Sequence, residues 1–322
     1  MFKLGCKITI TDSSDRVWHI SQVSSIEITR DTEKLTASCV ITLPKKIRWD
    51  GKREIPLRRG DKIVVQTGYD GRLERMFTGY IRDVGVKTPL TLTCEDAMYV
   101  LKQQKAEKKS YESVTIDRLL QEQGIPFAVR VMGEQSLGAY RVTADTVAEL
   151  LGNLQELGVR CFFGEEAGEP VLYAGVLIDR ETAGSMQHFG NGVQGNIIDD
   201  SLEQQSAESM RLRVTAISLQ PDNKKIKVEA GDADGEVRTI HAYNKSEEEL
   251  RAWAEQEVTR LKRDGLKGSF TTFGYKIVNM LDMVAITIDN VPKGVYRVQK
   301  NVIKYGTEGY RQEITIGPRC PG

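Results

Sequence analysis

The chain has no excess of charge of either sign. Its 322 residues include 45 Lys and Arg against 45 Asp and Glu, so the formal net charge is zero. General nucleic-acid binders normally have a marked basic excess, so that function class is disfavoured. A net charge near zero also leaves little electrostatic repulsion between copies, which favours self-association.

Long apolar runs and cysteine pairs are also scarce. No run approaches the ~20 apolar residues that a membrane-spanning helix needs, and the N-terminal stretch MFKLGCKITITDSSD has no apolar signal core. We therefore expect a chain that is made in the cytoplasm and does not insert into a membrane. The five cysteines are scattered and lack CxxC spacing, so we expect small core residues instead of disulfides or a zinc site. They are Cys6, Cys39, Cys94, Cys161 and Cys320.

Short β-type segments are what the chain has in abundance. In the first hundred residues they end at Gly, Pro or Asp turns, which is typical of a small antiparallel barrel or sandwich. The strongest hairpin signal is Asp70-Gly71, because a type I′ turn needs positive φ at both central positions. Asp234-Gly235 predicts a second hairpin of the same kind.

Helical patterns lie mainly between the two β-rich ends. Residues 113–120 predict a short helix. Apolar positions between 147 and 157 follow the helical period and predict an amphipathic helix with Asp145 as its N-cap. Ser246 and Glu249 form a capping box at the start of a third helix. Residues 101–178 therefore indicate a small α+β insert.

Two distant stretches share one pattern. Residues 60–96 and 281–318 each run from a turn Asp through an apolar strand and a hairpin to a final strand that alternates Leu or Ile with Thr. Asp61 aligns with Asp282. The pattern predicts a duplication, although any two β-meanders can look alike. We interpret Arg59-Gly60-Asp61 as the turn before a strand, in which the Asp bonds the backbone two residues on, and not as a cell-adhesion ligand.

Patterned stretches throughout the chain carry a resemblance to a known family. They are PLRRGDKIVVQ, MFTGYIRDV and LTLTCEDAMYVL near the start, TVAELLGNLQELGVRCFF and VLYAGV in the insert, and LDMVAITID and GVYRVQKNVIKYGTEGYRQEITIG near the end. With these features the chain resembles the baseplate hub proteins of contractile-tailed phages, the late-control-protein-D-like group. That group is related to the hub part of type VI secretion spike proteins.

The resemblance implies a homotrimeric ring. Each chain would carry two similar β-barrels, so that three chains give pseudo-six-fold symmetry. The ring would contact a six-fold tail tube on one side and a three-fold spike on the other, with other baseplate proteins as further partners. DNA would be only a channel cargo. Such a protein is first in the host cytoplasm and then in the virion baseplate or a phage-like particle.

The resulting fold prediction is mainly β with an α+β insert: two similar antiparallel β-barrels per chain plus small α/β domains. The predicted domains are 1–100 for the first barrel, 101–178 for the insert, 179–265 for strands and a helix that lead into the second barrel, and 266–322 for the remainder of that barrel. Some members of the family are fused to a lysozyme, peptidase or spike. This sequence ends at Gly322, soon after its last predicted strand, so we expect no such domain.

Basic residues beside a tryptophan form a candidate interface. Arg48 and Trp49, with Lys52 and Arg53, combine residue types that are enriched at protein–protein contacts. Lys105 to Lys109 form a second basic run. The alternative for both runs is a solvated surface.

We expect no catalytic residue, metal or cofactor. The histidines, His19, His188 and His241, lie in separate segments. Asp199, Asp200 and Glu203 contain the carboxylates that a glycan or cell-wall hydrolase would need; the alternative is a solvated loop. Residues 232–236 lack the spacing of a calcium loop, and residues 190–195 lack the Lys of a phosphate loop. A tail-associated hydrolase and a β-rich receptor-binding module are the two alternative functions.

Overall fold

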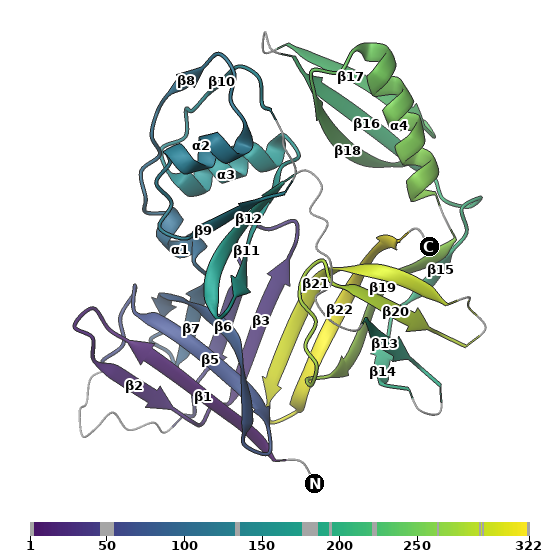
Figure 1. Ribbon diagram of the computed structural model, residues 1–322. Coiled ribbons are helices and arrows are strands. Elements are labelled where there is room, and N and C mark those ends of the chain that lie inside the picture. Colours follow the sequence, from purple (N-terminus) through teal and green to yellow (C-terminus); the bar gives the residue numbers. More distant parts are fainter. Residues whose placement is uncertain are drawn as a thin grey trace.

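The computed structural model describes residues 3–45, 55–132, 136–175, 186–192, 195–220, 224–262, 264–289, 291 and 293–320. Strands dominate, which confirms the prediction of a mainly β fold. Figure 1 shows two β-rich halves side by side, with two smaller units above them. Among the described helices, none combines the length and apolar composition needed to cross a bilayer.

The first half contains the strands of the purple and blue sheet in Figure 1. They are β1 (Leu4–Thr11), β2 (Val17–Ile20), β3 (Ser25–Asp31), β4 (Ser38–Thr42), β5 (Lys62–Tyr69), β6 (Arg72–Val84) and β7 (Thr91–Glu95). Their order in the sheet is β2-β1-β5-β6-β7-β4-β3, and each pairing is antiparallel. Asp70 and Gly71 have φ of 51° and 80°, which confirms the predicted hairpin turn between β5 and β6.

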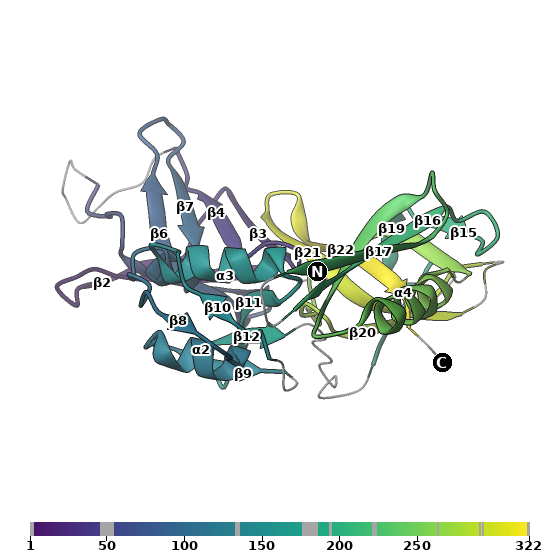
Figure 2. The ribbon, with the colours of Figure 1, turned by 90° about the horizontal axis from the view of Figure 1, so that it is seen from above.

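The second half contains the strands of the green and yellow sheet. They are β13 (Gln187–Gly190), β14 (Ile197–Asp200), β15 (Glu203–Gln205), β19 (Gly265–Phe273), β20 (Met283–Thr287), β21 (Gly294–Gly306) and β22 (Gly309–Arg319). Strand β21 also pairs with β3, so both halves belong to one 14-stranded sheet, seen from above in Figure 2. Among the described strands, the pairings of each half do not lead back to the strand at which they start. Closure of each half into a barrel therefore stays a prediction.

The insert follows β7 and lies over the first half. Its elements are α1 (Met98–Leu101), β8 (Ser110–Tyr111), α2 (Ile116–Glu122), β9 (Ala128–Val131), β10 (Tyr140–Arg141), α3 (Val147–Glu156), β11 (Arg160–Glu166) and β12 (Glu169–Gly175). Thr146, and not Asp145, is the N-cap of α3, so that prediction was wrong by one residue. Thr146 has the extended backbone of a cap, and its Oγ1 accepts from the amide of Glu149 at 3.2 Å.

A second small unit interrupts the second half between β15 and β19. It consists of β16 (Leu212–Leu219), β17 (Lys225–Gly231), β18 (Glu236–Tyr243) and α4 (Glu247–Leu261). The capping box of Ser246 and Glu249 is confirmed. The hairpin predicted at Asp234-Gly235 is wrong, because β17 and β18 lie on opposite sides of β16. After this turn the amide of Glu236 donates to the carbonyl of Arg211, which starts β18 parallel to β16.

Four of the cysteines are core residues, as predicted. Cys6, Cys39, Cys94 and Cys161 are buried, and Cys320 is half-buried. Burial raises the pKa of the Cys94 and Cys161 thiols to about 12, so they stay protonated and unreactive near neutral pH.

The insert and the second half share a small apolar cluster. Phe162 and Tyr173 of the β11–β12 hairpin pack with Met280 and Leu281, which precede β20. This cluster fixes the insert against the second half of the sheet.

Candidate assembly surface

The two aligned aspartates make the same turn. The Asp61 carboxylate accepts from the amide of Arg58 at 2.7 Å, and the Asp282 carboxylate accepts from the amide of Asn279 at 2.8 Å. The residue before each Asp has positive φ, 93° at Gly60 and 67° at Leu281. Each Asp therefore caps the backbone three residues before it, and not two residues after it as predicted.

The strands that follow these turns pair in the same register. Lys62 lies opposite Tyr80 between β5 and β6, and Met283 lies opposite Arg297 between β20 and β21. The amide of Ile81 donates to the Asp61 carbonyl at 2.9 Å, as the amide of Val298 does to the carbonyl of the matching Asp at 2.9 Å.

A bulge also recurs at the matching place. The register of β6 with β7 shifts between Ile81 and Asp83, and that of β21 with β22 shifts between Val298 and Lys300. The duplication predicted from sequence is confirmed at this level, because register and bulges differ freely among unrelated meanders.

The correspondence extends to the neighbouring strands. The order β3-β4-β7-β6-β5-β1 in the first half matches β14-β19-β22-β21-β20-β13 in the second, with β15 continuing β14 along β19. Matching strands also occur in the same sequence order. One pair differs in direction: β1 is antiparallel to β5, whereas β13 is parallel to β20.

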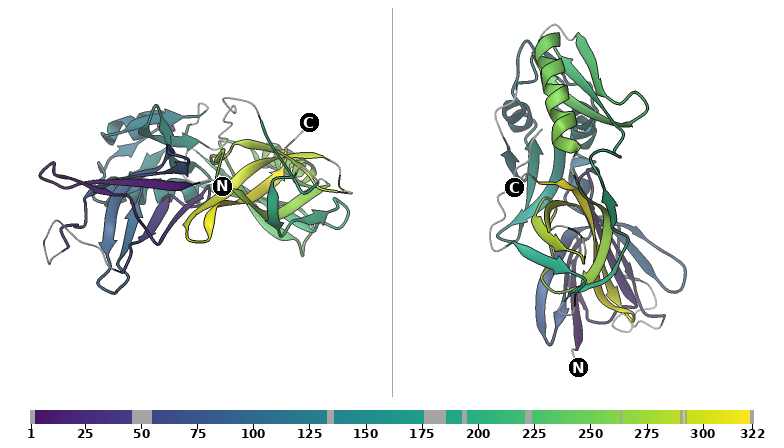
Figure 3. Two further views of the ribbon diagram at one scale, coloured as in Figure 1. Left: turned by 90° about the horizontal axis from the view of Figure 1, so that it is seen from below. Right: turned by 90° about the vertical axis from the view of Figure 1, so that its right-hand side faces the viewer.

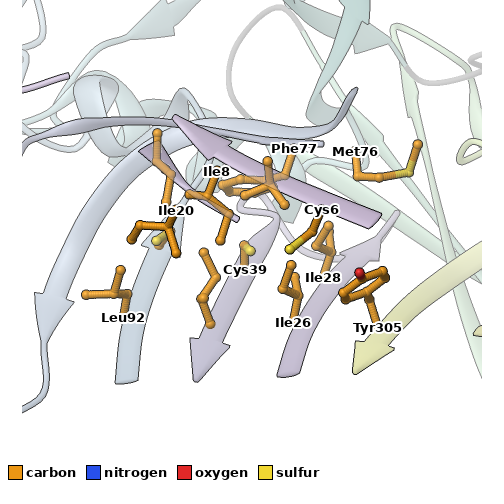
Figure 4. Close-up of a cluster of buried hydrophobic side chains, with 14 of the residues drawn as sticks. Cys6, Ile8, Ile20, Ile26, Ile28, Cys39, Met76, Phe77, Leu92 and Tyr305 are labelled. Carbon is orange, nitrogen blue, oxygen red and sulfur yellow. The ribbon is translucent and has the colours of Figure 1, made fainter. Parts of the chain in front are cut away.

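The two halves meet through the β21–β22 hairpin. Its far end leaves the second half and pairs with β3, from Lys300 opposite Asp31 to Gly306 opposite Ser25. Figure 3 shows these yellow strands beside the purple strands of the first half. Ile303, Tyr305 and Tyr310 of this hairpin are buried in the first core. In Figure 4, Tyr305 lies next to Ile26 and Ile28 of β3.

Hydrogen bonds fix the hairpin in this core. The Thr67 hydroxyl donates to Tyr310 Oη at 2.9 Å, and Tyr69 Oη donates to the Tyr310 carbonyl at 3.2 Å. Burial raises the pKa of Tyr310 to about 12, so the phenol remains neutral. Sequence reasoning missed this junction, because β3 and the hairpin that covers it lie more than 200 residues apart in the chain.

A cavity of about 230 Å³ lies where the two halves and the insert meet. Arg30 and Asp96 line it, and the Arg30 guanidinium donates to the Met76 carbonyl. Burial lowers the pKa of Arg30 and raises that of Asp96 to about 7. The Asp96 carboxylate accepts from the amides of Ala37 and Met98 at 2.8 and 3.0 Å, so its role is to join β4 to α1.

The predicted basic interface cannot be placed, because Arg48, Trp49, Lys52 and Arg53 lie outside the described residues. The second basic run is engaged within the insert: Lys108 pairs with Asp145 at 2.6 Å and Lys109 pairs with Glu122 at 2.7 Å. These pairs match the alternative of a solvated, locally paired surface.

The carboxylates considered for hydrolysis lie on an open sheet edge. Asp199, Asp200 and Glu203 are exposed on β14 and β15. The histidines are on three separate strands, β2, β13 and β18. Within the part of the chain that the structure describes, no three His, Cys, Asp or Glu side chains gather as metal ligands would.

The calcium-like segment is a turn. The Asp232 carboxylate accepts from the amide of Leu212 at 3.0 Å and pairs with Lys262 at 2.5 Å. The oxygens of Asp232 therefore bind groups within the second small unit. The edges and faces of the duplicated halves remain as the candidate functional surface.

The fold therefore defines the class of this protein: a mainly β chain with two halves of matching strand order. No protein-family model and no curated protein matches the sequence. Solved structures do match. The tail protein from Neisseria meningitidis MC58 aligns with a TM-score of 0.63 at 15% identity, over 97% of this chain and 96% of that one. The 43 kDa tail protein of prophage MuSo2 from Shewanella oneidensis aligns with a TM-score of 0.63 at 17% identity, over 98% of both chains.

A secretion protein has a similar fold. The c3393 protein of E. coli, described as a component of the type VI secretion system with similarity to phage T4 tail proteins, aligns with a TM-score of 0.53 at 11% identity. The alignment covers 97% of this chain and 76% of that one. The resemblance to phage hub proteins that we inferred from sequence is thus confirmed at the level of the fold.

Proposed function

We propose that this protein is a structural hub of a phage tail or a phage-like contractile injection machine. Three copies form a ring that joins the tail tube to the central spike, and the ring belongs to the baseplate. The observation that carries the proposal is the duplication: two halves with the same strand order and register in one chain. The similar folds of phage tail proteins support it.

Symmetry explains why a duplicated chain suits this position. A cyclic trimer presents each surface three times, but a surface that occurs in both halves is presented six times. One face can then bind a six-fold tube and another a three-fold spike. In this proposal residues 1–100 contribute one ring-forming barrel. Residues 179–265 lead into the other barrel with β13–β15, and residues 266–322 supply its remainder, while residues 101–178 are the insert and β16–β18 with α4 are a connecting unit.

The proposed role requires no chemistry. Hydrolysis by two carboxylates needs a defined separation across a bound glycan, whereas Asp199, Asp200 and Glu203 lie exposed along an edge. We therefore propose that the protein is not an enzyme and that its edges and faces act in assembly.

Imaging tests the proposal directly. The full chain, alone and co-expressed with its cognate tube and spike proteins, is purified and imaged by electron microscopy. We expect top views with three-fold symmetry and six similar densities around a central channel. A chain that stays monomeric with both partners present contradicts the proposed ring.

A further inference from the structure

The β6–β7 hairpin of the first half corresponds to the β21–β22 hairpin of the second half, which is the segment that joins the two halves. The shared register makes Tyr80 the counterpart of Arg297, so residues 83–87 correspond to residues 300–304. Residues 300–304 pair with β3. Residues 83–87 have no strand beside them on the matching side among the described residues.

Val86 is the counterpart of Ile303. Ile303 is 1% exposed in the first core, whereas Val86 is 94% exposed, more than any other large hydrophobic residue of the described chain. Isolated exposed apolar residues are common on protein surfaces. Here, however, the duplicate of the exposed side chain is buried in the neighbouring half.

The second half has an open edge that corresponds to β3. Both β3 and the β14–β15 segment lie beside the matching strands β4 and β19, which makes residues 199–205 the counterpart of residues 25–31. In the pairings of the described strands, β21 covers β3, but β14 and β15 pair only with β19. An uncovered edge presents unpaired backbone groups to another strand.

We propose that residues 83–87 of one copy pair antiparallel with residues 201–205 of the next copy, which repeats between chains the pairing of β21 with β3. This inference rests on the proposed trimer and names its contact. Transfer of the observed register places Val86 opposite Leu202, as Ile303 lies opposite Ile28. Leu202 already packs on the core of the second half, which provides an apolar surface for Val86.

Charge also favours the contact. Lys87 takes the position of Lys304, which lies opposite Glu27. Across the proposed contact Lys87 lies opposite Ser201, between the exposed carboxylates of Asp200 and Glu203. The contact is head-to-tail, so three copies close a ring without leaving a free edge of this kind.

Disulfide trapping tests the register. Opposed residues of antiparallel strands have Cα atoms about 4.5–5.5 Å apart, which suits a disulfide. In a Cys320→Ser background, we expect Lys87→Cys with Ser201→Cys to give covalently closed trimers on oxidation. A mixture of the two single variants should give only covalent dimers, and each single variant alone should give none.

Two controls calibrate the yield. Lys304→Cys with Glu27→Cys reproduces the observed pairing within one chain and must close efficiently. Lys87→Cys with Gln205→Cys is out of register by four residues and should cross-link roughly tenfold less, because the distance along a strand grows by about 3.4 Å per residue.

A charge at Val86 tests the apolar contact. Val86→Asp should weaken trimer formation by roughly tenfold or more, since it buries a carboxylate beside acidic residues. Val237→Asp is the matched control, because Val237 is 48% exposed on β18, and should leave the oligomer unchanged.

The outcomes separate this inference from the proposed function. Trimers that assemble but give no interchain disulfide, while the Lys304 control closes, overturn the edge pairing and leave the hub intact. Covalent open polymers support the pairing and contradict a three-membered ring. A chain that stays monomeric with tube and spike proteins present overturns both.

Discussion

At the scale of single residues, Asp96 is the clearest pH-dependent group. Asp96 is 6% exposed, and its carboxyl group lies between β4 and α1. Burial raises its pKa from 3.8 to about 7. At a pH between these two values, the folded protein holds a proton there that the unfolded chain has released. The group therefore favours folding more at pH 5 than at pH 8.

We expect Asp96→Asn to remove this pH dependence. The melting temperature of the native protein relative to the variant should rise as the pH falls from 8 to 5, by the equivalent of about 2 kcal/mol of unfolding free energy. The Asn loses one acceptor at every pH, which shifts the difference by a constant only. Asp234→Asn, at an exposed turn, is the control, and a pH-independent difference for Asp96→Asn contradicts the expectation.

The paired turn aspartates give a second prediction at this scale. Asp61→Ala and Asp282→Ala should each lower the free energy of unfolding by about 1–2 kcal/mol, because each leaves a backbone amide without its acceptor. Denaturant unfolding measures both. Arg59→Ala should change stability by less than about 0.5 kcal/mol, since its side chain is exposed. Clearly unequal losses for the two aspartates would contradict equivalent turns.

At the scale of elements, the two matching hairpins have opposite environments. Ile303 is buried in the first core and Val86 is exposed to solvent. We expect Ile303→Ala to cost about 2–4 kcal/mol in denaturant unfolding of the separate chain. Val86→Ala should change it by less than about 0.5 kcal/mol. A comparable loss at both positions would mean that Val86 is already buried in the single chain.

Local signals predicted single elements well and their partners less well. Asp70-Gly71 and the capping box of Ser246 and Glu249 depend on neighbours in sequence, and both are confirmed. The hairpin predicted at Asp234-Gly235 is wrong because both edges of β16 accept a strand. After this turn the chain pairs as β18 with the edge of β16 opposite β17, instead of folding back on β17. The cap at Thr146 shows the same limit at one residue, since Asp145 and Thr146 are both good N-caps.

At the scale of the whole molecule, the duplication was predictable and the junction was not. The aligned aspartates and strand patterns are visible in one sequence. That β21 pairs with β3, and that Tyr305 and Tyr310 enter the core of the other half, depends on contacts more than 200 residues apart in the chain. The candidate surface at Val86 was missed for the same reason, because the exposure of Val86 indicates a contact only when it is compared with the burial of its counterpart Ile303.

The hairpins differ in reach, and this has a consequence for the proposed ring. The β21–β22 hairpin pairs with β3 as far as Gly306, whereas β6 ends at Val84. The six seams of the ring would then alternate between a long seam inside each chain and a short one between chains. A ring of this kind would come apart at the short seams between chains and release whole subunits with both halves folded. Each new copy could then finish folding before it joins the proposed ring.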